Sequence, residues 1–200
     1  MTKTKVAALY VDTARGPYPK IENVECYGFA TRDGAQLDWT AKTSDARSYD
    51  GPWPVVAHPP CGPWGRFWWN YKGGEGSQLC GLRAVEQVRK HGGILEHPSN
   101  SSLWDACGMP APGEGHDVDG GYTIEVRQCD WGHKAAKPTW LYVVGVSAFP
   151  PLPEPKNPSH VMVRLLRNNC EKPEVPKKER HITPKSFAEW LVAAARTVAT

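Results

Sequence analysis

Short apolar runs, bounded by proline, glycine and polar residues, recur along the first three quarters of the chain. Their length is that of strands rather than helices, and their continuous apolar character is typical of strands buried on both faces. Strands are therefore predicted at 5–12, 23–30, 53–58, 92–95, 120–126 and 139–146, with a weaker one at 36–41.

Two stretches change to helical spacing. The first runs from Glu75 to His91 and is followed by Gly92 and Gly93, a glycine signal for a helix end. Its predicted apolar face consists of Leu79, Leu82, Val85 and Val88. The second begins at Thr183, predicted as the N-cap, with Pro184 in the first helical position. Its apolar face, expected to dock on the sheet, consists of Phe187, Trp190, Leu191, Ala194 and Val198.

Strands that alternate with helices or loops predict an α/β fold with an open sheet. A chain of 200 residues is long enough for one domain with a substantial core. We expect an α/β core at 1–146, a proline-rich basic excursion at 147–183 and a closing helix at 184–200.

Composition adds a few expectations to this picture. The net charge of +3 is a weak indication of an anionic partner. The sequence contains neither an apolar window of membrane-spanning length nor a signal-peptide pattern, so we expect a cytoplasmic protein without a membrane partner. The six cysteines form no C-x-x-C pair, which indicates free thiols and no metal site.

One cysteine stands out within the stretch "VVAHPPCGPWGRFWWNY", residues 55–71. Cys61 directly follows a predicted strand that two prolines end, because proline cannot donate to a strand ladder. Asp12 and Glu96 stand at the ends of two other predicted strands. Ligands in open α/β sheets bind beyond the carboxyl ends of the strands, so these three residues mark a candidate site.

The residue types at this edge suit covalent chemistry on an electron-poor ring. Cys61 would be the nucleophile and Glu96 the acid. Protonation of ring nitrogen 3 of a pyrimidine makes carbon 6 electrophilic, and addition of a thiolate there turns carbon 5 into a nucleophile. Cations that could stabilise a thiolate or a bound anion are Arg66, Arg127 and Lys137.

Three segments resemble the DNA cytosine-5 methyltransferase family. "HPPCGPWGR" resembles its Pro-Pro-Cys-Gln-x-Phe-Ser motif, with Trp64 in the aromatic position, and "LEHP" is similar to its Glu-Asn-Val motif. "GGYTIEVRQCDWGHKAAKPTWLYVVG" resembles the segment that follows, where Gly132 matches a glycine and Lys137 falls where an arginine is expected. The resemblance covers roughly residues 55–145.

The resemblance implies a mostly parallel, doubly wound sheet like that of S-adenosylmethionine-dependent methyltransferases, which is a Rossmann-like fold. It also implies cytosine in DNA as the substrate, a covalent adduct through Cys61 and protonation of the base by Glu96. The residues assigned to catalysis are Cys61, Glu96, Arg127 and Lys137. Those assigned to substrate binding are Pro60, Trp64, Arg66, His97 and His133. Those assigned to S-adenosylmethionine are Asp12, Arg15, Gly16 and Asp45.

The sequence also departs from this family. Its Gln and Ser after the cysteine are Gly62 and Gly65 here, and the residues after the glutamate are His97 and Pro98. The glycine-rich cofactor loop is replaced by "LYVDTARGPYPK", and no segment is long enough for a large target-recognition domain. Two alternatives therefore stay open: carbon-5 chemistry with another donor or on a free nucleotide, and a non-catalytic descendant that binds nucleic acid or protein.

Two further clusters have two interpretations each. Trp64, Trp68 and Trp69 could stack on a base, but tryptophans more often pack in a core. A basic cluster in the tail could contact phosphates, although a solvated face is the more common role of such a cluster. It consists of Lys177, Lys178, Arg180 and His181.

Overall fold

The computed structural model describes residues 4–28, 45–72, 76–163 and 171–199. Within them, six strands form one sheet in the order β2-β1-β3-β4-β6-β5. The strands are β1 (Val6–Leu9), β2 (Val24–Tyr27), β3 (Val55–Ala57), β4 (Gly93–Pro98), β5 (Tyr122–Arg127) and β6 (Pro138–Val144). The first four pair in parallel, and β6 lies antiparallel between β4 and β5. The predicted α/β class and the open, mostly parallel sheet are confirmed.

The strands lie where the apolar runs predict them, and the weak run at 36–41 falls outside the described residues. All four residues of β1 are fully buried, because helices cover both faces of the sheet. Leu9 pairs with Ala57, and Ala57 pairs with Leu95. The three strands therefore end side by side, and the residues that follow them share one edge of the sheet.

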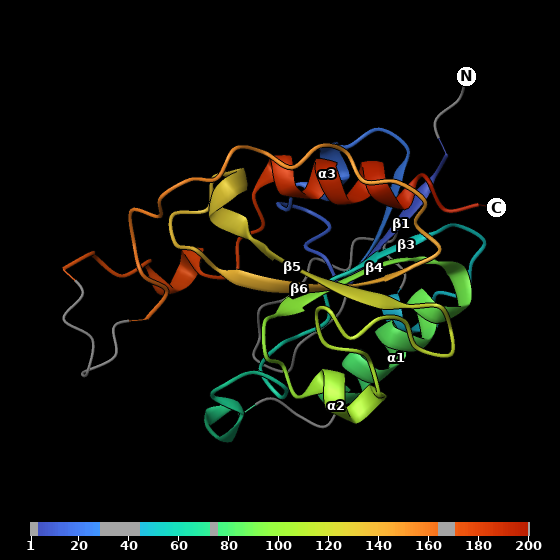
Figure 1. Ribbon diagram of the computed structural model, residues 1–200, viewed down its shortest axis with the longest axis horizontal. Helices are drawn as coiled ribbons and strands as arrows, with labels where there is room; N and C mark the ends of the chain where they lie inside the picture. The colour runs from blue at the N-terminus through green and yellow to red at the C-terminus, as the bar shows by residue number, and fades with distance from the viewer. Residues whose placement is uncertain (1–3, 29–44, 73–75, 164–170, 200) are drawn as a thin grey trace.

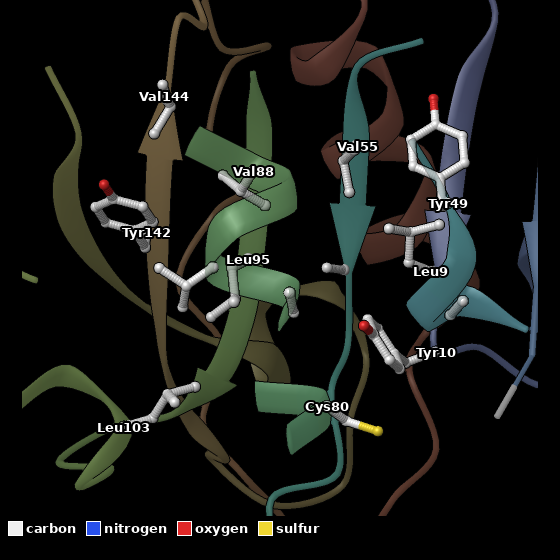
Figure 2. Close-up of a cluster of buried hydrophobic side chains, with 14 of the residues drawn as sticks. Leu9, Tyr10, Tyr49, Val55, Cys80, Val88, Leu95, Leu103, Tyr142 and Val144 are labelled. Atoms are coloured by element: carbon white, nitrogen blue, oxygen red, sulfur yellow. The ribbon is translucent and has the colours of Figure 1, made fainter. Parts of the chain in front are cut away.

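Helices cover the sheet on two sides (Figure 1). α1 (Gly76–His91) and α2 (Leu103–Cys107) lie on one face, and α3 (Lys185–Ala195) lies on the other. Figure 2 shows the α1 face, where Leu9, Val55 and Leu95 from neighbouring strands meet Val88 of the helix. Alternate strand residues point to the opposite face and pack against α3. No helix in the described ranges is long and apolar enough to cross a membrane.

The predicted apolar face of α1 is only partly correct. Val85 and Val88 are buried as expected, but Leu79 is 57% exposed. A strict three-residue step drifts around a helix of about 3.6 residues per turn, so its first member leaves the buried face. Cys80 and Ala84 occupy that face instead. The helix ends at His91, and the φ of +71° at the following Gly92 is the left-handed geometry that the glycine signal predicts.

The closing helix α3 docks on the sheet as predicted, with Phe187, Trp190, Leu191 and Ala194 buried. Its predicted start is wrong by one residue. Pro184 occupies the N-cap position and provides no side-chain cap, so Thr183 lies outside the helix. Val198 lies beyond the helix end and pairs with Val146 in an isolated bridge.

The excursion packs along α3 at its start. Phe149 stacks on Trp190 with ring centroids 4.9 Å apart, and the indole N–H donates to the carbonyl of Pro150 at 3.0 Å. Further along, the amide of Lys156 donates to Asp130 at 2.8 Å. These contacts attach the proline-rich segment to the core.

The basic cluster of the tail is partly occupied by internal contacts. The Arg180 guanidinium binds Glu174 at 3.0 Å and the carbonyl of Val175 at 2.9 Å. Lys177 and Lys178 are exposed. This arrangement favours the interpretation of the cluster as a solvated face in which Arg180 stabilises the tail.

Candidate active site

The site is built where β3 and β4 leave their shared register. Ala57 and Leu95 are the last pair, so His58 and Glu96 follow as neighbours. Ala57 and Leu95 belong to the α1-side core. Because side chains alternate along a strand, His58 and Glu96 point to the α3 side.

Glu96 and the side chains of His58, Tyr18 and Gln128 form what we call the Glu96 network. His58 Nδ1 lies 2.9 Å from Glu96 Oε2, and its Nε2 lies 2.5 Å from the hydroxyl of Tyr18. Gln128 Nε2 donates to Glu96 Oε1 at 2.8 Å and to Thr139 Oγ1 at 3.0 Å. The side chains of His58 and Glu96 are only 11% and 12% exposed. Both carboxylate oxygens and both imidazole nitrogens therefore have protein partners.

The network keeps Glu96 ionised. Burial by itself would raise the pKa of its carboxyl, but the hydrogen bond and charge of His58, with contributions from Lys137 and His97, lower it to about 2. Burial and the charge of Glu96 raise the pKa of Tyr18 well above its ordinary value, so its hydroxyl stays protonated. That hydroxyl can donate to a neutral His58 or accept from an imidazolium.

Cys61 begins a tight turn after the two prolines and is exposed. Its carbonyl accepts from the amides of Trp64 at 3.1 Å and Gly65 at 2.8 Å. A Cβ at position 62 would lie 2.2 Å from the Tyr71 ring, and one at position 65 would lie 3.0 Å from the Cys61 carbonyl oxygen. Gly62 is therefore required by the packing of this turn, and a side chain at position 65 would fit only tightly.

The Cys61 thiol is within electrostatic reach of two predicted partners. Although the residue is exposed, the protein atoms around the sulfur raise its pKa by desolvation, and the negative charge of Glu96 raises it further. The positive charge of Lys137 opposes both effects. The resting sulfur is therefore a thiol. Cys61, Glu96 and Lys137 therefore lie close enough for their charges to affect one another's pKa values.

Lys137 is held in an unusual position. Its φ of +45° is a left-handed conformation that costs a non-glycine residue on the order of 1 kcal/mol or more. Burial lowers the pKa of its ammonium group, while Glu96 and Cys61 raise it. The Nζ atom donates to the carbonyl of Ile182 at 3.1 Å, so the tail helps to fix this cation.

Two of the predicted residues are engaged in other contacts. Arg127 belongs to β5 at the edge of the sheet, with β6 and β4 between it and β3, and it binds Asp130 at 3.0 Å. His133 is buried, and its Nδ1 bonds to the backbone of Ala135. Burial lowers its pKa. The imidazole lines a cavity of about 150 Å³ beside the tail residues Val175 and Glu179.

Two further residues predicted to bind substrate serve in packing instead. His97 is 0% exposed and lies on the α1 side of the sheet, with its ring 6.4 Å from that of Trp104. Burial lowers its pKa to about 4, so the ring is neutral. Trp64 packs against the α1-side core, with its indole beside Gly81. Pro60, which precedes Cys61, is half-buried.

The tryptophans after Cys61 differ from expectation in another way. Trp68 and Trp69 are 61% and 60% exposed, so the prediction that they pack in the core is wrong. Arg66 is also exposed, with its guanidinium 5.9 Å from the ring centroid of Phe67. These side chains remain available to a partner.

The turn at residues 12–16, which was predicted to bind the cofactor, is held by hydrogen bonds between its own residues. Asp12 Oδ1 accepts from the amides of Ala14 at 2.9 Å and Arg15 at 2.8 Å, and the Asp12 carbonyl accepts from Gly16 at 3.2 Å. Position 16 must be glycine because a Cβ there would lie 2.6 Å from that carbonyl oxygen. The Arg15 side chain is exposed.

Asp45, the other acid assigned to the cofactor, is engaged in the same way. Its carboxylate caps the short helix η2 (Ala46–Ser48) and binds the guanidinium of Arg47. This hydrogen bond is the main reason that the pKa of Asp45 is lowered. The carboxylates of Asp12 and Asp45 and the amides of Arg15 and Gly16 are thus already engaged in local hydrogen bonds.

Three residues of the Glu96 network were missed by sequence reasoning. His58 had a signal, since it is the first residue after an apolar strand and directly precedes the two prolines. Gln128 follows β5, and Tyr18 begins the short helix η1 (Tyr18–Lys20) after β1. Their approach to Glu96 depends on the fold and has no local sequence signature.

Among the described residues, no group of three or more His, Cys, Asp or Glu side chains could hold a metal ion. The described cysteines are free thiols, in agreement with the absence of a C-x-x-C pair. Comparison of the chain with protein-family models and with curated proteins finds no match.

Proposed function

We propose that this protein modifies carbon 5 of a cytosine ring through a covalent adduct with Cys61. The observation that carries the proposal is the exposed thiol at the carboxyl edge of the parallel strands, within electrostatic reach of Glu96 and Lys137. The order of the sequence motifs supports it. An open sheet with one reversed strand is also compatible with the methyltransferase-like fold that the resemblance implies.

The Glu96 network supports protonation of the ring. Glu96 is ionised at neutral pH, so it cannot supply a proton of its own. An imidazolium at His58 can pass its Nδ1 proton through the Glu96 carboxylate to ring nitrogen 3. His58 then keeps its hydrogen bond to Tyr18 through Nε2, while its Nδ1 no longer donates to Glu96.

Addition of Cys61 follows from this protonation. The thiol releases its proton to water, and the thiolate forms a bond to carbon 6 while the electron pair of the ring double bond moves to carbon 5. The charge of Lys137 favours the thiolate. Carbon 5 can then take a new substituent. Loss of its original proton, departure of the thiolate and release of the proton on ring nitrogen 3 restore the neutral ring.

The identity of the donor is a separate question. S-adenosylmethionine would supply a methyl group in the family that the sequence resembles. The fit of this chain is poor, because the amides of Ala14, Arg15 and Gly16 all bind Asp12 and the carboxylate of Asp45 binds Arg47. We therefore derive no step through this cofactor.

Exchange of the hydrogen on carbon 5 tests the adduct without any donor. In heavy water, carbon 5 of the adduct takes a deuteron and loses its proton, and the loss of the H5 signal is followed by proton NMR. We expect the full chain to catalyse this exchange on a cytosine-containing oligonucleotide, and we would measure deoxycytidine monophosphate in parallel to identify a nucleotide-level substrate.

Cys61→Ser should abolish the exchange because the nucleophile is lost. Cys107→Ser is the matched control, since this half-buried cysteine lies on α2 and should leave the rate unchanged. Absence of exchange on both substrates, or exchange that persists in Cys61→Ser, would show that the proposal is wrong.

A further inference from the structure

The segment after Cys61 exposes aromatic surface. Phe67, Trp68 and Trp69 are 44%, 61% and 60% exposed, and they are the only large aromatic side chains among the exposed hydrophobic residues that the structure describes. We refer to residues 66–72 as the aromatic loop. Its middle forms the short helix η3 (Trp68–Asn70), and the segment protrudes from the body of the molecule, in blue-green at the lower left of Figure 1.

The three rings form a pre-arranged cluster. Trp69 packs edge-to-face against Phe67, with centroids 5.6 Å apart, and against Trp68 at 6.4 Å. The amide of Trp68 donates to Gly65, which continues the turn that begins at Cys61. Rings that support one another lose little conformational entropy when a planar ligand stacks on them.

The aromatic loop is attached to the turn that carries the nucleophile. Its Tyr71 ring packs directly over Gly62, and the Tyr71 hydroxyl donates to Ser77 of α1 at 2.7 Å. The exposed rings therefore stand beside the Cys61 turn and are connected to it by rigid contacts.

The charge of this region favours a polyanion. Residues 58–72 contain Arg66 and Lys72, both exposed, and no acidic residue. The Arg66 guanidinium lies 5.9 Å from the Phe67 ring centroid, where it can interact with a phosphate and a base together. Exposed aromatic rings combined with cations are the chemistry that binds unpaired nucleic-acid strands without sequence preference.

We infer that the aromatic loop binds single-stranded nucleic acid, with unpaired bases stacked on Trp68 and Trp69 and phosphates facing Arg66 and Lys72. This inference rests on the proposed function for its substrate, since it assigns the unpaired strand that carries the target cytosine. A single strand offers its bases for stacking without the cost of opening a duplex.

Equilibrium binding of a labelled oligodeoxycytidylate of about 12 nucleotides tests the inference. Fluorescence anisotropy is measured on the full chain with Cys61→Ser, so that binding does not depend on chemistry. Adding Trp68→Ala and Trp69→Ala should weaken binding at least about tenfold, while Trp68→Phe with Trp69→Phe should retain most of the affinity. The matched control is Leu79→Ala with Val118→Ala, which removes exposed apolar groups elsewhere and should change nothing.

Salt and strandedness provide two more readouts. Arg66→Ala with Lys72→Ala should make the dependence of log affinity on log salt shallower by about 1.4 for a single strand. The same sequence as a duplex should bind more weakly than the single strand.

The inference is wrong if the alanine aromatic variant binds like the parent, if the apolar control loses as much affinity, or if the duplex binds as tightly. It is also wrong if the parent binds lipid vesicles or protein but no single strand. Binding without hydrogen exchange at carbon 5 would overturn the proposed function alone, and exchange without aromatic-dependent binding would overturn this inference alone.

Discussion

Replacing Glu96 with glutamine measures what the ionised carboxylate contributes to folding. Its oxygens accept from His58 and Gln128, and its pKa is about 2, compared with an ordinary value of 4.5. Because the folded-state value is the lower one, the stabilisation is present above pH 4.5 and is lost as the pH falls from 4.5 toward 2. The difference corresponds to about 3 kcal/mol of unfolding free energy at neutral pH.

Urea unfolding followed by tryptophan fluorescence is the assay. We expect Glu96→Gln to be less stable than the parent by about 3 kcal/mol at pH 7, and by less than half of that at about pH 3, where the stabilisation is mostly lost. Glu125→Gln is the control, because this exposed residue on β5 only accepts from the Trp140 indole, and its effect should stay within about 0.5 kcal/mol at both pH values.

Two results would refute this reasoning. The first is a Glu96→Gln destabilisation that is the same at both pH values, since a neutral packing defect does not titrate. The second is a carbon-13 NMR titration of the Glu96 carboxyl with a midpoint at or above 4.5, because the network would then not favour its ionised form.

Two other substitutions test the surroundings of the site. His97 has a pKa of about 4 in the folded chain, below its ordinary 6.5, so stability should fall by up to about 3 kcal/mol as the pH decreases from 6.5 to 4. His97→Leu should remove this dependence in urea unfolding; an unchanged pH profile would contradict it. Gly81→Ala would bring a Cβ to 2.7 Å from the Trp64 indole nitrogen and should cost about 1–3 kcal/mol, seen as a lower melting temperature. Gly76→Ala, whose Cβ would meet only a side-chain atom at 3.8 Å, should not destabilise; equal losses for both glycines would exclude the packing explanation.

The strands could be predicted from the sequence because helices cover both faces of the sheet. A strand buried on both faces must be apolar throughout, as Val6–Leu9 is, and this leaves a continuous run that is easy to recognise. The position of β6 between β4 and β5 could not be predicted, since it depends on register between distant segments.

The residues of the candidate site likewise fall into those that a local sequence signal identifies and those that only the fold brings together. Cys61 and Glu96 were found because each stands where an apolar run ends, a local signal. Tyr18 and Gln128 were missed because only the folded chain brings them to Glu96 and His58. The exposure of Trp68 was missed because composition predicts burial for a tryptophan, whereas its actual position depends on how the Cys61 turn directs the chain.

The protonation states at rest suggest an order of events for the proposed reaction. Burial and Glu96 keep Cys61 as a thiol, which limits oxidation of an exposed cysteine, because the thiolate is the reactive form. The Glu96 carboxylate is ionised, and in the proposed reaction it receives a proton from His58. When that proton reaches ring nitrogen 3, the ring becomes positively charged beside the sulfur. The charges of the ring and of Lys137 then oppose the effect of the Glu96 charge on the pKa of Cys61. The same transfer that activates the ring therefore lowers the cost of forming the thiolate, so that nucleophile and electrophile arise together only when substrate is bound.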